Sequence, residues 1–159
     1  MLLYEERGGC AMADNEDRAD EEKMESLFQT ARGAAEAAYA PYSRFRVGAA
    51  LLAEDATVYS GCNVENRSFG LTICAERNAL CQGVAKGRRA FIALAVVTPD
   101  SKEPVGPCGA CRQVLSEFMG SGAKVRFGNG GPAWVDTTMG ALLPYDSLHD
   151  LAKESGGKD

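Results

Sequence analysis

The sequence predicts an α/β protein in which one mixed β-sheet is covered by helices on both faces. The chain has 159 residues, 45% of them hydrophobic and 25% charged, which suits one domain with a substantial core. Segments of helical and of strand pattern follow one another in the order α, β, β, α, β, α, β, β, α, without internal repeats. Residues 91–98, FIALAVVT, are almost wholly apolar, which is typical of a central strand buried on both faces.

The first half of the chain predicts one helix and a hairpin. From Met24 onward apolar residues recur at helical spacing, so we expect a helix over 20–40 that Pro41 ends. Two β-rich segments, 47–53 and 57–63, follow and are joined by a short acidic turn. Because the turn is so short, the two strands are expected to be antiparallel neighbours.

The second half of the chain alternates helices and strands. The apolar strand 91–98 leads through an expected helix over 108–119 to another strand, which favours a right-handed crossover between parallel strands. The other expected elements are a helix over 74–86 that ends at Gly87, short strands over 124–127 and 134–137, and a last helix over 147–153.

Three regions are expected along the chain. Residues 1–20 are polar, acidic and without sustained periodicity, which is typical of a flexible N-terminal extension. One folded domain is expected over 21–153, and residues 154–159 are expected to be a frayed tail. No apolar run approaches the ~20 residues that span a bilayer, and the first residues resemble no secretory signal. We therefore expect a cytoplasmic protein without a membrane partner.

The charge balance favours a small-molecule partner. The formal net charge is −5, whereas a nucleic-acid binder usually displays a basic surface that neutralises phosphates. Nucleic acid is therefore not an expected partner. The chain has one histidine, His149, far in sequence from the motifs described next, so Ser–His–Asp and Cys–His catalysis have little support.

Three cysteines carry the chemistry that the sequence predicts. Cys74, Cys108 and Cys111 lie where irregular chain enters an expected helix, and the last two are three residues apart, so their thiols point to one side. Helix N-termini favour thiolates. Catalytic zinc usually has three protein ligands and one open position. These cysteines therefore predict a site for one Zn²⁺ per subunit.

Two further side chains are expected to act at this site. Glu76 follows Cys74 by two residues, close enough to exchange protons at the open position without being a ligand. Three thiolates leave Zn²⁺ with a net negative charge, which Arg77 or Arg112 could offset by hydrogen bonds to sulfur. We favour Arg77 because it stands beside the expected acid/base.

Other interpretations of these cysteines stay open at this point. Cys108 and Cys111 alone could be a thioredoxin-like redox pair. A structural zinc site would need a fourth ligand, for which Cys62 and Cys81 are candidates, although their positions in a strand and at helical core spacing predict small buried hydrophobes. A zinc-stabilised binding module without turnover is the non-enzymatic alternative.

With these residues the sequence resembles the cytidine deaminase family. Zinc deaminases combine a short Cys-x-Glu or His-x-Glu segment with Pro-Cys-x-x-Cys, and the similarity extends beyond those motifs over residues 24–151. The segments that carry it are Cys74-Ala75-Glu76, Pro107-Cys108-Gly109-Ala110-Cys111, Tyr42-Ser43-Arg44-Phe45-Arg46-Val47-Gly48-Ala49-Ala50, Gly61-Cys62-Asn63-Val64-Glu65-Asn66 and Leu142-Leu143-Pro144.

The resemblance implies a three-layer α/β/α fold with a central mixed five-stranded sheet. It implies zinc-dependent hydrolysis of cytidine and deoxycytidine to uridine and deoxyuridine plus ammonia, in pyrimidine salvage. By similarity, Cys74, Cys108 and Cys111 bind zinc and Glu76 is the proton shuttle. The residues that the resemblance assigns to the substrate are Phe45 against the ring, the backbone of Ala75 at the base edge, and Asn63 with Glu65 at the ribose.

The chain departs from the family pattern at three places. Phe69 stands where many members have tyrosine, Arg67 replaces a small residue, and the aromatic expected after Leu142-Leu143-Pro144 is matched only loosely by Tyr145. The chain length resembles the homotetrameric branch of the family, in which neighbouring subunits complete each site. A deaminase of a related cytosine nucleoside such as blasticidin S is the alternative within this class.

Overall fold

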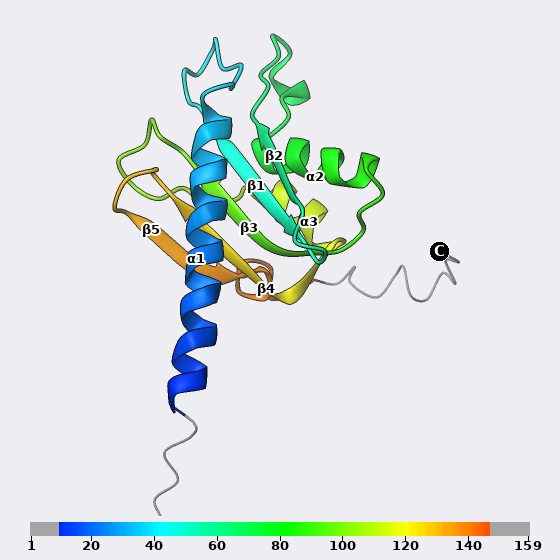
Figure 1. The fold of residues 1–159 in the computed structure, drawn as a ribbon. Helices are drawn as coiled ribbons and strands as arrows, with labels where there is room; N and C mark the ends of the chain where they lie inside the picture. The colour runs from blue at the N-terminus through cyan, green and yellow to red at the C-terminus, as the bar shows by residue number, and fades with distance from the viewer. Residues whose placement is uncertain (1–9, 147–159) are drawn as a thin grey trace, which may run out of the picture.

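A computed structural model describes residues 10–146 of the chain (Figure 1). Within that range the chain forms one sheet, four α-helices and a short 3-10 helix. In chain order these are α1 Cys10–Ala35, β1 Gly48–Ala53, β2 Val58–Cys62, η1 Phe69–Leu71, α2 Ala75–Ala85, β3 Phe91–Val97, α3 Gly109–Ser116, β4 Met119–Gly128, β5 Trp134–Thr138 and α4 Met139–Leu142.

The sheet is mixed and has five strands in the order β2-β1-β3-β4-β5. β3 and β4 are parallel and are joined through α3, and every other neighbouring pair is antiparallel. The expected mixed five-stranded sheet is confirmed. β3 is its middle strand, and all of its residues except Ile92 are buried, as the apolar run predicts.

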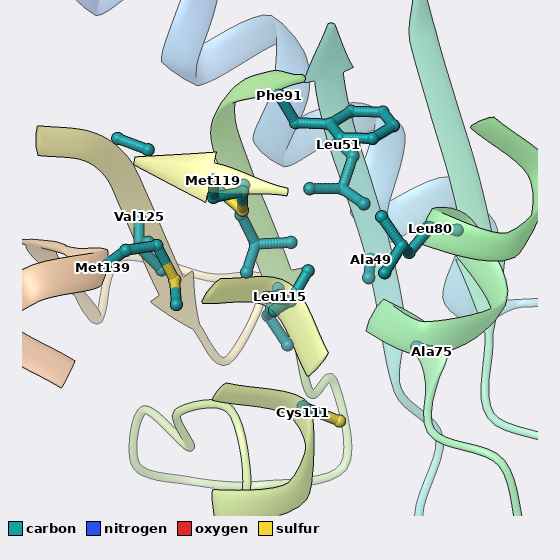
Figure 2. Close-up of a cluster of buried hydrophobic side chains, with 14 of the residues drawn as sticks. Ala49, Leu51, Ala75, Leu80, Phe91, Cys111, Leu115, Met119, Val125 and Met139 are labelled. Carbon is teal, nitrogen blue, oxygen red and sulfur yellow. The ribbon is translucent and has the colours of Figure 1, made fainter. Parts of the chain in front are cut away.

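Helices cover both faces of the sheet, so the fold has three layers (Figure 1). Alternate residues of a strand point to opposite faces. Accordingly, Ala50 of β1 packs with the apolar side of α1, whereas its neighbours Ala49 and Leu51 pack with α2 and α3. Figure 2 shows the second of these two clusters, in which Leu80 of α2 and Leu115 of α3 contact the strands.

α1 differs most from the expected helix. It begins at Cys10, so half of the segment expected as an irregular extension is helical, and it ends at Ala35, well before Pro41. The earlier end has a tertiary cause, because Tyr39 donates its N–H to Asn63 O at 3.0 Å and accepts from Glu65 N at 2.8 Å, which a helical residue could not do. No helix among residues 10–146 is long and apolar enough to cross a membrane.

Smaller differences concern the second half of the chain. α3 is shorter than expected and β4 is longer, because β4 begins at Met119, which pairs with Phe91 and is buried. The helices η1 and α4 were not expected. The expected helix over 147–153, the tail 154–159 and His149 lie outside the described residues.

The strand order brings two distant segments to one edge of the sheet. Gly48 at the start of β1 pairs with Cys62 at the end of β2 and with Val97 at the end of β3. The chain therefore leaves β2 and β3 at the same edge, and each of these exits leads to the N-terminus of a helix, α2 or α3. Gly48 is required there, because a Cβ would lie 1.9 Å from the carbonyl oxygen of Ala31.

Candidate active site and zinc centre

Three thiols converge at this edge of the sheet. The sulfur atoms of Cys74, Cys108 and Cys111 all lie within 4.8 Å of one another, and those of Cys74 and Cys108 are 3.9 Å apart. Cys108 is exposed, Cys74 is half-buried, and Cys111 is buried at the end of the core that also contains Ala75 (Figure 2). The group is thus open on one side and packed on the other.

Helix N-termini hold two of the thiols. Cys74 is the N-cap of α2 and Cys108 is the N-cap of α3, and neither side chain makes a capping hydrogen bond. Cys111 lies in the first turn of α3. The unpaired N–H groups and the partial positive charge of a helix N-terminus favour negatively charged sulfur. The two helices therefore supply the electrostatic environment that a thiolate cluster needs.

The titration of the thiols reflects their proximity. The pKa of Cys74 is lowered to about 5, chiefly by the hydrogen bond shared with Cys111 and also by the hydrogen bond and charge of Arg77, while burial opposes the shift. The same contact raises the pKa of Cys111, and burial and the nearby Glu76 add to that increase. The contact between the two sulfurs therefore favours a thiolate at Cys74 and a thiol at Cys111.

Glu76 is a buried carboxyl beside these thiols. It lies in the first turn of α2 with only 4% of its surface exposed. Burial is the main cause that raises the pKa of Glu76, and the negative charge of Cys74 adds to it. A carboxyl in such an environment can hold a proton more readily than one in water.

The two arginines of the motifs have different partners. Arg77 Nη2 donates to Cys74 Sγ at 3.4 Å and to Thr72 O at 3.2 Å, and its buried Nε has no hydrogen-bond partner among the described residues. Arg112 donates instead to the carbonyl oxygens of Pro107, at 2.7 Å, and Leu142, at 3.2 Å. Arg77 thus contacts sulfur, whereas Arg112 ties the loop before α3 to α4.

A short bridge holds the segment after β2 next to Cys74. Val64 and Ile73 exchange two backbone hydrogen bonds, at 2.9 and 3.0 Å, so the chain folds back on itself between them. Because the bridge is antiparallel, Asn63 lies on the same side of it as Cys74, whereas Glu65 lies on the other side. The sequence pattern did not predict this contact between residues nine apart in sequence.

Asn63 is more constrained than a residue at the end of an exposed strand would be. It is buried, its Oδ1 accepts from Val47 N at 2.8 Å, and its Nδ2 donates to Phe45 O at 2.9 Å. One amide hydrogen and one oxygen lone pair are left for another partner. Asn63 thus holds the segment that carries the half-buried Phe45.

Cys62 and Cys81 do not belong to the three-thiol group. Both line a groove of about 630 Å³ between the end of α1, β2 and α2. Cys81 is exposed, so the expectation of a buried core position is wrong for it, because α2 turns this side toward the groove and not toward the sheet. Cys62 is half-buried and donates to Ala37 O at 3.4 Å.

Comparisons with known proteins agree with this geometry. Residues 21–128 match the family described as the cytidine and deoxycytidylate deaminase zinc-binding region. A cytidine deaminase of Sporosarcina psychrophila is 50% identical over 121 residues, which cover 76% of this chain and 88% of that protein. The chain belongs to the cytidine deaminase family. The family resemblance seen in the motifs is thereby confirmed.

Further members of the family support the assignment. A cytidine deaminase of Halalkalibacterium halodurans is 52% identical over 118 residues, which cover 74% of this chain and 89% of that protein. The crystal structure of cytidine deaminase from Burkholderia pseudomallei has a TM-score of 0.73 and 47% identity, covering 76% of this chain and 96% of that one. The corresponding structure from Mycobacterium tuberculosis has a TM-score of 0.66 and 41% identity, covering 77% and 95%. The three-layer cytidine-deaminase-like fold is confirmed.

The donor set fits the zinc that the family binds. Four ligands at ~2.3 Å in a tetrahedron are about 3.8 Å from one another, and the sulfur atoms of Cys74 and Cys108 are 3.9 Å apart. Cys74, Cys108 and Cys111 would supply three of the four ligands of such a site. Zinc is therefore the cofactor of this chain, as the sequence predicts.

Proposed function

We propose that this protein hydrolyses cytidine and deoxycytidine to uridine and deoxyuridine plus ammonia. The observation that carries the proposal is the convergence of three thiols with a buried carboxyl, Glu76, at one edge of the sheet. Relatives named cytidine deaminase, about half identical over most of their length, support the same activity. We further propose that the reaction belongs to pyrimidine salvage.

In this proposal Cys74, Cys108 and Cys111 hold the zinc. When bound, zinc supplies Lewis-acid activation of a water molecule for hydrolysis. Arg77 offsets the charge of the sulfurs through its hydrogen bond to Cys74. Glu76 takes a proton from the attacking water and delivers it to the ring nitrogen N3. It then carries the second proton of that water to the departing amino group. Its burial keeps bulk water from competing for that proton.

The substrate would be held by groups that surround the thiols. Phe45 would pack on the pyrimidine ring, and the backbone of Ala75, the first residue of α2, would contact the base edge. Glu65 would accept a hydrogen bond from a ribose hydroxyl, and Asn63, with one amide hydrogen still available, would contribute beside it. The antiparallel Val64–Ile73 bridge supports this arrangement because it holds Asn63 on the side of Cys74.

Neither alternative is favoured by a specific observation. A redox pair at Cys108 and Cys111 needs neither the third thiol nor Glu76, and the match to a zinc-binding deaminase region does not favour it. Blasticidin S deamination has no support from the relatives, which are named for cytidine. One experiment separates these functions. Purified protein is incubated with cytidine, deoxycytidine or blasticidin S, and ammonia release and zinc content are measured.

Replacing Glu65 by glutamine should weaken substrate binding without removing zinc. Losing a charged hydrogen-bond acceptor typically costs about 1.5–3 kcal/mol, so we expect KM for cytidine to rise at least about 10-fold. Glu54→Gln, at an exposed glutamate in the β1–β2 turn, is the matched control. Steady-state kinetics and zinc content are the measurements. An unchanged KM would refute the assignment of Glu65.

We also propose a cytoplasmic homotetramer in which neighbouring subunits complete each site. Free cysteines that ligate zinc suit a reducing compartment. Apolar side chains are exposed next to the site: Phe69 is 74% exposed, Leu71 66% and Ile73 42%. Such a patch is typical of an interface.

The tetramer predicts that Phe69→Glu lowers the molar mass in solution. A buried charge on this patch would oppose association, because an unpaired charge is costly to desolvate. Light scattering coupled to size exclusion should give four chain masses for the wild type and fewer for the variant. Val58→Glu, at an exposed valine of β2 away from the patch, is expected to stay tetrameric. A monomeric wild type would contradict the proposal.

A further inference from the structure

The hydroxyl of Ser43 lies between two residues that the proposed function assigns to the substrate. Its Oγ donates to Glu65 Oε1 and accepts from the backbone N–H of Phe45 at 3.0 Å. A serine hydroxyl offers one donor and two acceptor sites, so both contacts can exist at once. The residue is exposed and belongs to neither hydrophobic cluster.

Across the part of the chain that the structure describes, every hydrogen bond to the Glu65 carboxylate comes from the turn that contains Ser43. Its Oε2 accepts from Tyr42 N at 2.9 Å and from Ser43 N at 3.2 Å, while the Ser43 hydroxyl is the one hydrogen-bond donor to Oε1 among the described residues. The backbone N–H of Glu65 donates to Tyr39 O at 2.8 Å, which fixes the other end of the residue. The hydroxyl therefore decides which way Oε1 points.

The turn itself is strained and needs such contacts. Arg44, between Ser43 and Phe45, has φ of 57°, in the left-handed region that few residues other than glycine adopt. Its N–H donates to Ala40 O at 3.0 Å. Without the link from Ser43 to Phe45 N, the turn loses a contact on the far side of the strained residue, and Phe45 loses its fixed position relative to Glu65.

We propose that Ser43 is a positioning residue that sets the distance between the ring-binding and ribose-binding groups, Phe45 and Glu65. The inference rests on the proposed function, because it takes the roles of those two residues from it. Ser43 itself need not contact substrate. Its effect is expected on nucleoside binding, not on zinc or on the chemical step.

The test is a comparison of Ser43→Ala with Ser43→Thr. The alanine variant loses a hydrogen bond to a charged group, so KM for cytidine should rise about 10-fold while kcat changes by less than about twofold. Threonine keeps the hydroxyl and should restore KM. Ser101→Ala is the matched control, because the Ser101 hydroxyl also bridges two groups of a loop, Glu103 O and Glu103 N, without touching Phe45 or Glu65.

A double-mutant experiment distinguishes a positioning role of Ser43 from a general loss of order in the turn. In a Glu65→Gln background the Ser43→Ala change should raise KM far less than in the wild type, because the two residues act through one contact. Equal effects in both backgrounds, an unchanged KM, or a threonine variant as weak as alanine would overturn the role of Ser43 while leaving an active wild type and the proposed function intact. A wild type inactive on cytidine would overturn both.

Discussion

Replacing Cys108 by alanine should remove zinc from the protein and reduce deamination at least about 100-fold, because changes that only surround the ligands already cost about 10–100-fold in metal affinity or activity. Cys108 is the exposed member of the three-thiol group, so its removal disturbs the core least. Cys111 is fully buried in the core, and its replacement would mix loss of a ligand with loss of packing. Zinc content after gel filtration and cytidine turnover are the measurements.

Cys81→Ala is the matched control for this experiment. Cys81 is also an exposed free thiol, but it lies on the groove over β2 and outside the three-thiol group. The control should keep one zinc per chain and wild-type turnover. A Cys108→Ala protein that retains stoichiometric zinc would show that the metal is held elsewhere and would remove the basis of the proposed function.

Replacing Glu76 by glutamine should abolish most turnover while zinc stays bound. General acid/base groups contribute about 10²–10⁴-fold to rate, so kcat should fall by at least about 100-fold. Glutamine has nearly the same shape, which matters at a position with 4% exposure. The readouts are kcat, zinc content and the thermal midpoint of unfolding, of which only kcat should change strongly.

Glu117→Gln provides the control for charge removal on a helix near the site. Glu117 is an exposed residue at the end of α3. Its variant should be as active as the wild type. If Glu76→Gln kept full activity, a different group would have to move the protons, and the link between buried carboxyl and chemistry would fail.

The sheet and most of its elements could be predicted from local pattern alone. The run over Phe91–Val97 is apolar at nearly every position, and a strand buried on both faces is the one setting that accommodates it. Boundaries that depend on pairing could not be predicted so well. α1 stops at Ala35 because the backbone of Tyr39 is hydrogen-bonded to Asn63 and Glu65. These partners lie more than twenty residues beyond Tyr39 in the sequence.

The arginines show the same division. Arg77 and Arg112 occupy similar places beside their cysteines, charge does not distinguish them, and only the position of Arg77 beside Glu76 favours it. In the folded chain Arg77 donates a hydrogen bond to the sulfur of Cys74, whereas Arg112 donates one to the carbonyl oxygen of Leu142. No sequence pattern predicts the role of Arg126, which is 2% exposed on β4 and pairs with Asp136 of β5 and Glu21 of α1.

The sequence by itself determined the chemistry: three thiols at helix starts, a carboxyl two residues from one of them, and the strand and helix periodicities that make an α/β sheet. Only the tertiary structure decided how those groups meet. The order β2-β1-β3 brings the ends of two strands to one edge, and the Val64–Ile73 bridge holds Asn63 on the side of Cys74. The physical reason is that residue type and spacing fix which atoms can bind or ionise, whereas distances between remote segments depend on strand pairing and side-chain contacts such as that of Ser43 with Glu65.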